Sequence, residues 1–90
     1  MKYVVVCVRD RAGNVFGVPQ FVVSAGAAIR SFGDGINNEA KDNPLYMHPE
    51  DFDLYSLGTY DDENGSFSGD VPKQIAVGKD FSVRSNGSGS

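Results

Sequence analysis

The start of the chain alternates between apolar runs and short polar segments. Residues 3–8 are apolar at every position and rich in β-branched side chains, which is typical of a strand covered on both faces and therefore central in its sheet. The polar residues 10–14 end in Gly-Asn and predict a hairpin loop, after which residues 15–18 return as a partner strand. Because Pro19 cannot donate to a strand ladder, we expect this partner to be short or at an edge, followed by a further extended piece at residues 21–23.

Apolar residues then recur at spacings of three and four, which predicts a single helix. Ser24 is a suitable N-cap, and the apolar positions that follow it are Ala25, Ala28, Ile29, Phe32 and Ile36. Three glycines in this stretch each weaken a helix by about 1 kcal/mol relative to Ala. The helix must therefore gain stability by packing its apolar stripe on the sheet, and we expect it to give way to a loop that continues past Pro44.

The second half of the chain predicts another hairpin. Residues 49–51 are typical of the start of a turn or of one helical turn, and residues 52–60 are typical of a strand. Strict alternation puts two sets of side chains on opposite faces of this strand: Asp53, Tyr55, Leu57 and Thr59 on one, and Phe52, Leu54, Ser56, Gly58 and Tyr60 on the other. Asn64-Gly65 predicts a tight turn, with residues 66–68 as the return strand and residues 74–77 as one more extended segment.

The order hairpin, helix, hairpin predicts an α+β fold, with a small, mostly antiparallel sheet of about four strands and one amphipathic helix packed on a face. Ninety residues suffice for one domain. We place this domain at residues 1–82. We expect residues 83–90 to be a flexible tail, whose Gly-Ser-Gly-Ser ending is typical of an added linker.

The chain has one cysteine and one histidine, which narrows its chemistry. Cys7 cannot form an intramolecular disulfide, and this favours a reducing compartment. Together with His48 it provides too few ligands for structural zinc. The apolar start is far shorter than the roughly 20 residues that span a bilayer, and it lacks the cleavage pattern of a signal peptide. We therefore expect a soluble cytoplasmic protein that does not bind membranes.

Three groups of residues resemble known chemical sites without completing one. Residues 61–65 resemble the opening of a calcium loop, but the acidic twelfth residue is missing because that position is Pro72. His48, Glu50 and Asp51 put an imidazole beside two carboxylates, and we expect them to be spread over a surface loop in structural roles. The glycines form no phosphate-binding motif. We therefore predict no enzymatic activity, no catalytic residues, no metal and no cofactor.

The net charge of −4 is unevenly distributed along the chain. It is +3 over residues 1–30, −9 over residues 31–70 and +2 over residues 71–90. Binding of single-stranded nucleic acid needs basic groups that follow phosphates and aromatic faces on which bases stack. The basic termini and neighbouring aromatic residues could supply both. The candidate nucleic-acid-binding residues are Arg9, Arg11 and Arg30 for phosphates, and Tyr3, Phe16 and Phe21 for bases.

Two other interpretations of these residues stay open. The aromatic side chains could form core while the arginines solvate a loop. The acidic middle could instead meet the basic ends of another copy or of another protein, since complementary charge favours association.

The order of motifs resembles a known family. The apolar strand ends in Arg9-Asp10, and the helix contains Ala-Ala-Ile-Arg-Ser-Phe at residues 27–32. The most specific part is His-Pro-Glu-Asp-Phe-Asp-Leu-Tyr at residues 48–55, followed by Leu-Gly-Thr-Tyr-Asp at residues 57–61. From about residue 2 to residue 81 the chain is similar to the small non-structural protein of gokushoviruses, which are tailless single-stranded DNA phages of the Microviridae.

This resemblance implies a non-catalytic accessory protein in the cytoplasm of the bacterial host. The family is likened to the microviral protein that helps switch replication toward synthesis and packaging of the single-stranded genome. The implied partners are single-stranded DNA or the phage replication and procapsid machinery. The alternative is a protein-interaction or assembly factor that does not bind DNA, acting as a homodimer or on the coat protein or replication initiator.

Overall fold

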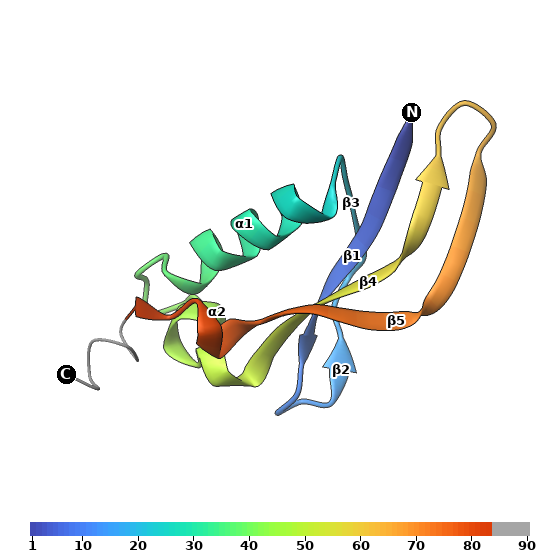
Figure 1. The fold of residues 1–90 in the computed structure, drawn as a ribbon. Helices are drawn as coiled ribbons and strands as arrows, with labels where there is room; N and C mark the ends of the chain where they lie inside the picture. The colour runs from blue at the N-terminus through green and yellow to red at the C-terminus, as the bar shows by residue number, and fades with distance from the viewer. Residues whose placement is uncertain (84–90) are drawn as a thin grey trace.

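A computed structural model describes residues 1–83; residues 84–90, which make up most of the predicted tail, lie outside the described part of the chain. The structure is an antiparallel sheet with one main helix across a face (Figure 1). In chain order its elements are β1 (Lys2–Asp10), β2 (Val15–Phe16), β3 (Gln20–Val22), α1 (Ala25–Ile36), α2 (Pro44–Met47), the 3-10 turn η1 (Pro49–Asp51), β4 (Phe52–Asp61), β5 (Ser66–Val77) and the 3-10 turn η2 (Gly78–Asp80). The predicted α+β class is confirmed.

Strand β1 lies at the centre of the sheet, as its continuous apolar run predicts. It pairs with β4 on one side, and on the other side with β2 and β3, which pair with opposite halves of it. Pro19 separates β2 from β3, so the sheet has five strands and β2 is only two residues long. Strand β5 pairs only with β4 within the described residues, so its Pro72 stands in an edge strand where proline is tolerated.

The two extended segments predicted at residues 66–68 and 74–77 are parts of one strand. The β4–β5 ladder continues across two irregularities, between Leu54 and Tyr55 and between Ser56 and Gly58. Sequence patterns treat such an interruption as a strand end. The backbone pairing shows that it is a change of register within one long edge strand.

Helix α1 covers one face of the sheet. It begins where predicted, because the Ser24 hydroxyl accepts a hydrogen bond from the Ala27 N–H at 3.1 Å. The core between helix and sheet consists of Val6, Ala28, Phe32, Ile36, Leu54 and Ala76. Burying a side chain such as Phe32 contributes about 1.5–3 kcal/mol. This packing offsets the low helix propensity of the three glycines in α1.

The loop expected after α1 contains a short helix, α2, which the sequence analysis missed. Asn43 starts it: its Oδ1 accepts from the Leu45 N–H at 3.2 Å, while its Nδ2 donates to the Gly35 carbonyl at 2.9 Å. Pro44 fits the first helical position because it needs no donor there. Of the two alternatives for residues 49–51, a turn or one helical turn, the structure has the helical turn, η1.

A β-bulge in β4 overturns the predicted alternation of that strand. Val6 pairs with Ser56 and Val5 with Gly58, which leaves Leu57 as an extra residue. From Gly58 onward, each side chain of β4 lies on the face opposite to the one that strict alternation predicts. Tyr60 therefore lies on the same face as Tyr55, and its predicted side was wrong because strict alternation ignores an inserted residue.

Glycine is required at the bulge. Gly58 has φ +144°, and a Cβ there would lie 2.1 Å from the carbonyl oxygen of Ser68 on β5. A side chain would both strain this backbone and push β5 away. The close approach of β4 and β5 at the bulge thus depends on Gly58.

Candidate nucleic-acid interface

The face of the sheet opposite α1 is called here the open face, because within residues 1–83 neither α1 nor α2 packs on it. Val4, Val6 and Val8 of β1 point toward α1. Alternation along β1 therefore sends the intervening side chains to the open face. These side chains are Tyr3, Val5, Cys7 and Arg9.

Four aromatic rings from four strands meet on the open face. We call Tyr3, Phe21, Tyr60 and Phe67 the aromatic cluster. The ring centroids of Phe21, Tyr60 and Phe67 lie 5.3–5.7 Å apart, and that of Tyr3 lies 6.5 Å from Tyr60. Phe21 and Phe67 are 48% and 60% exposed. Exposed rings gathered in one patch mark a binding surface more often than a core.

A second aromatic pair lies farther along the same face. Phe16 and Tyr55 meet edge to face with centroids 5.2 Å apart. The Arg9 guanidinium lies 5.3 Å from the Phe16 ring centroid, and its Nη2 donates to Asn14 Oδ1 at 2.9 Å. These contacts hold Arg9 at one end of the sheet.

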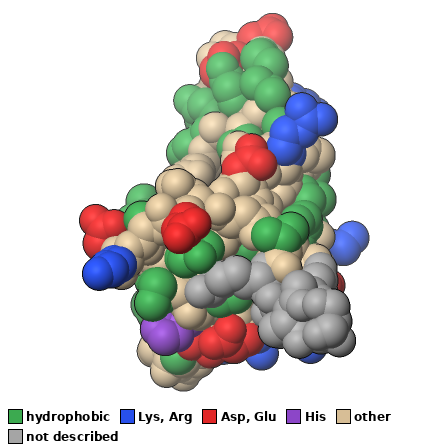
Figure 2. All heavy atoms as spheres, turned by 90° about the vertical axis from the view of Figure 1, so that its left-hand side faces the viewer, with side chains coloured by type: hydrophobic (Ala, Val, Ile, Leu, Met, Phe, Trp, Pro, Cys, Tyr) green, Lys and Arg blue, Asp and Glu red, His purple; other side chains and the backbone are tan. Residues whose placement is uncertain are grey.

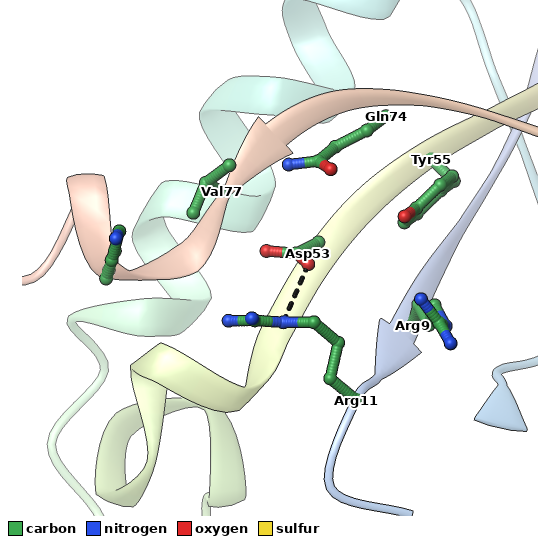
Figure 3. A pocket seen from close by; sticks show the side chains of 7 residues that line it. Arg9, Arg11, Asp53, Tyr55, Gln74 and Val77 are labelled. Atoms are coloured by element: carbon green, nitrogen blue, oxygen red, sulfur yellow. Dashed lines mark ion pairs between the residues drawn. The ribbon is translucent and has the colours of Figure 1, made fainter. Parts of the chain in front are cut away.

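Basic residues from both ends of the chain meet beside this pair, in a hollow of about 370 Å³. We call it the basic hollow, and Figure 3 shows side chains that converge on it from β1 and the loop after it, from β4 and from β5, while Lys79 comes from η2. Its lining residues are Arg9, Arg11, Asp53, Tyr55, Gln74, Val77 and Lys79. Three cations against one carboxylate favour an anionic ligand.

Asp53 is the buried member of the hollow, with 3% of its surface exposed. Its Oδ2 lies 2.9 Å from Nε of Arg11, the ion pair dashed in Figure 3. Arg11 also donates to the backbone carbonyl of Glu50. By contrast, Oδ1 of Asp53 and Nε of Arg9 are buried without hydrogen-bond partners among the described residues. Two residues that line the hollow thus each have one buried polar atom without a partner, an acceptor on Asp53 and a donor on Arg9.

An acidic turn lies at the opposite end of β4. There the Met1 ammonium lies 2.6 Å from Asp62 Oδ1 and 3.3 Å from Glu63 Oε2. The hydrogen bond with Asp62 raises the pKa of the ammonium and lowers the pKa of the carboxyl. The predicted hairpin is confirmed, with Gly65 at φ +71°.

The acidic turn is too far from the basic hollow to cancel its charge. Asp53 and Asp61 stand at the two ends of β4, and eight residue steps of extended strand span roughly 26 Å. Charges interact weakly beyond the Debye length of about 8 Å at physiological salt.

The structure brings five of the six candidate residues to the open face or its edge. Tyr3 and Phe21 belong to the aromatic cluster, Phe16 contacts Arg9, and Arg11 lines the basic hollow. Arg30 does not join them. It lies exposed on α1, which packs on the opposite face, beside Gly26, Ala27 and Ser31.

Four aromatic or basic residues of this surface, Tyr55, Tyr60, Phe67 and Lys79, were not predicted from the sequence. Tyr55 lies in the predicted strand, but no functional role was predicted for it. Tyr60 was predicted on the wrong face of that strand because the bulge was not foreseen. Phe67 could have been found, because the Asn-Gly turn places it opposite Tyr60. Lys79 carries no local signal that links it to Arg9 and Arg11.

The residues with catalytic potential are not among the residues that line the basic hollow. Ligand atoms of His48, Glu50 and Asp51 lie within 4.8 Å of one another, so the expectation that they spread over a loop was wrong; η1 turns them together. The first two are exposed, and Figure 2 shows the imidazole at the surface near acidic side chains. Cys7 is buried, and burial raises the pKa of its thiol.

Comparison with known proteins identifies a family. A sequence model described as phage ORF5 protein matches residues 3–81, which include the aromatic cluster and the basic hollow. No curated protein and no solved structure matches the chain. Among the helices of residues 1–83, none has the length and apolar character needed to cross a membrane.

Proposed function

The chain belongs to the phage ORF5 protein family, and from this premise we propose that it is a non-catalytic accessory protein that binds single-stranded DNA along the open face. Within the family we propose a gokushovirus (Microviridae) protein, acting in the cytoplasm of the bacterial host. Its role would be in replication of the single-stranded genome or in its packaging. The exposed aromatic cluster on the open face is the observation that carries the proposal.

The geometry of the open face supports stacking of bases. Phe21 and Phe67 are about half exposed on a sheet, and the Phe16–Tyr55 pair continues the row of rings toward the basic hollow. Aromatic rings on the open face of a sheet stack the bases of single strands in several unrelated modules. Each stacked base contributes about 1–3 kcal/mol by alanine substitution and needs no particular sequence.

The charges support modest, salt-dependent affinity. Arg9, Arg11 and Lys79 gather at one end of the aromatic row, where they can contact phosphates. Three such contacts are few compared with proteins that bind DNA mainly through phosphates. The acidic turn does not oppose this binding, because it lies at the far end of β4.

The proposal assigns no chemical reaction to the protein. His48, Glu50 and Asp51 are grouped outside the basic hollow, and Cys7 is buried. We propose no cofactor and no resident metal.

A protein-interaction role is the second candidate, because β5 offers a long edge. Residues 66–74 of β5 are exposed, and the side chain of Val71 is 86% exposed. A sheet edge can pair with a strand of another chain. The partner would be a second copy, the coat protein or the replication initiator.

Fluorescence anisotropy with a labelled single-stranded oligonucleotide of mixed sequence tests the first candidate. Phe67→Ala should weaken binding roughly 5-fold to 150-fold, the value of one stacked base. Val71→Ala is the matched control, since it removes another exposed apolar side chain from β5. Absence of binding by micromolar wild-type protein at low salt, or an unchanged affinity of Phe67→Ala, would refute DNA binding along this face. Light scattering with candidate partners then tests the second candidate.

A further inference from the structure

Resting on the proposed binding of single strands, we infer that the basic hollow seats one nucleobase with an exocyclic amino group beside a ring acceptor, as in cytosine and adenine. The free Oδ1 of Asp53 would accept a hydrogen bond from this amino group. The hollow would thereby give a sequence preference to a surface that otherwise stacks any base.

The first support is the state of the Asp53 carboxylate. Only 3% of this residue is exposed, and Arg11 occupies Oδ2 at 2.9 Å, while Oδ1 has no partner among the described residues. Figure 3 shows the side chain inside the hollow, on the side of Val77 and Gln74. A buried acceptor without a hydrogen bond is unfavourable. A ligand that brings an N–H group to Oδ1 removes this cost.

The neighbouring cations are placed so that they leave Oδ1 to a ligand. Arg9 is the cross-strand neighbour of Asp53, yet its guanidinium donates to Asn14 and lies near the Phe16 ring. Lys79 forms no ion pair with any carboxylate of residues 1–83. Lys79 is thus free to contact a phosphate of the bound DNA strand, while Oδ1 of Asp53 can bind only a group that donates a hydrogen bond.

The rest of the lining matches the edge and face of a base. Tyr55 provides a ring beside the hollow, and it already contacts Phe16. The buried Nε of Arg9 and the amide of Gln74 are donors for the ring acceptor that stands next to the amino group. Acidic side chains accept from the cytosine amino group in known nucleic-acid complexes.

Thymine fits this arrangement less well. Its single N–H lies in the ring between two carbonyl oxygens, and these would face the carboxylate of Asp53. An exocyclic amino group projects from the edge of the base, so it can approach the recessed Oδ1 of Asp53 more closely than the ring N–H of thymine can. The hollow therefore discriminates by one hydrogen bond, which corresponds to roughly threefold to tenfold in affinity.

Three oligonucleotides of equal length test this inference by fluorescence anisotropy at neutral pH: oligo-dC, oligo-dT, and oligo-dC built from N4,N4-dimethylcytosine. The dimethyl base keeps the charge and the ring but has no amino N–H. Wild-type protein should bind oligo-dC roughly threefold to tenfold more tightly than either of the others.

Asp53→Asn tests the residue itself. The amide of Asn can donate to a thymine carbonyl as well as accept from a cytosine amine, so the ratio of dC to dT affinity should fall to about one. Glu50→Gln is the matched control. It removes one negative charge from a neighbouring residue whose contact with Arg11 is through the backbone carbonyl, so the ratio should persist.

The outcomes separate this inference from the proposed function. If wild-type protein binds none of the three strands, DNA binding itself is refuted. If it binds all three equally, the base-reading role is refuted and stacking along the open face stands. A preference that survives in Asp53→Asn overturns the role of Asp53. If circular dichroism shows that this variant does not fold, the dimethylcytosine comparison on the wild type decides.

Discussion

The salt dependence of DNA binding should fall when the basic hollow loses two of its cations. The informative change is Arg9→Gln combined with Lys79→Gln. It leaves the ion pair between Arg11 and Asp53 intact, so the buried carboxylate keeps its partner. Arg30→Gln combined with Lys41→Gln is the matched control. It removes the same charge from exposed positions on α1 and in the loop before α2.

The size of the effect follows from the number of phosphate contacts. For single strands, each contact contributes about −0.7 to the slope of log affinity against log salt concentration. Three cations therefore give a slope of about −2, and one remaining cation gives about −0.7. A fourfold rise in salt should then weaken wild-type binding roughly 20-fold and binding by the double variant roughly threefold.

Anisotropy titrations at several salt concentrations, with one oligonucleotide and constant pH, measure these slopes. The control variant should keep the wild-type slope. Equal slopes for the wild type and the Arg9/Lys79 variant would refute phosphate contact in the hollow. A slope reduced as much by the Arg30/Lys41 control would show that net charge, and not the hollow, determines the salt effect.

Two further predictions concern the fold. Gly58→Ala should lower the free energy of unfolding by more than about 2 kcal/mol, because the new Cβ would meet a backbone oxygen of β5 and the backbone there has a positive φ. Urea denaturation measures this loss, and Gly69→Ala is the control because a Cβ at Gly69 has open space. Similar losses of stability in the two variants would contradict this reason. Asp62 raises the pKa of the Met1 ammonium above its ordinary value of 8.0, and the ammonium lowers the pKa of the Asp62 carboxyl below its ordinary value of 3.8. The stabilisation that the two groups give each other is therefore lost as the pH rises above 8, where the ammonium loses its proton, or falls below 3.8, where the carboxylate gains one. An NMR titration of Asp62→Asn should show the ammonium pKa returning toward 8.0, and an unchanged value would rule out this contact as the cause.

The elements that local chemistry specifies could be predicted from the sequence. Ser24 caps α1, Asn64-Gly65 forms the β4–β5 turn, and the apolar run of β1 places that strand at the centre. Each of these depends on a few consecutive residues and their backbone preferences. The helix α2 was missed because its cap, Asn43, also donates hydrogen bonds to the carbonyls of Gly35 and Asn38, which lie outside any local pattern.

The candidate surface was predictable only in part. Arg9 and Phe16 face each other across the first hairpin, and the predicted hairpin was enough to place them on neighbouring strands. The bulge at Leu57 changed the face of Tyr60, and a bulge depends on pairing with another strand as well as on the residues within it. Arg30 was misplaced because helical periodicity shows which side of a helix is apolar but not which face of the sheet it covers.

By itself, therefore, the sequence determined the kinds of elements, their order and the residue types available for binding. The tertiary structure alone decided that Arg9, Arg11, Asp53 and Lys79 share one hollow and that the acidic turn lies at the other end of β4. The physical reason is that strand register joins residues more than forty positions apart in the chain. Backbone hydrogen bonds and packing over the whole sheet set this register, and no single segment contains the information that fixes it.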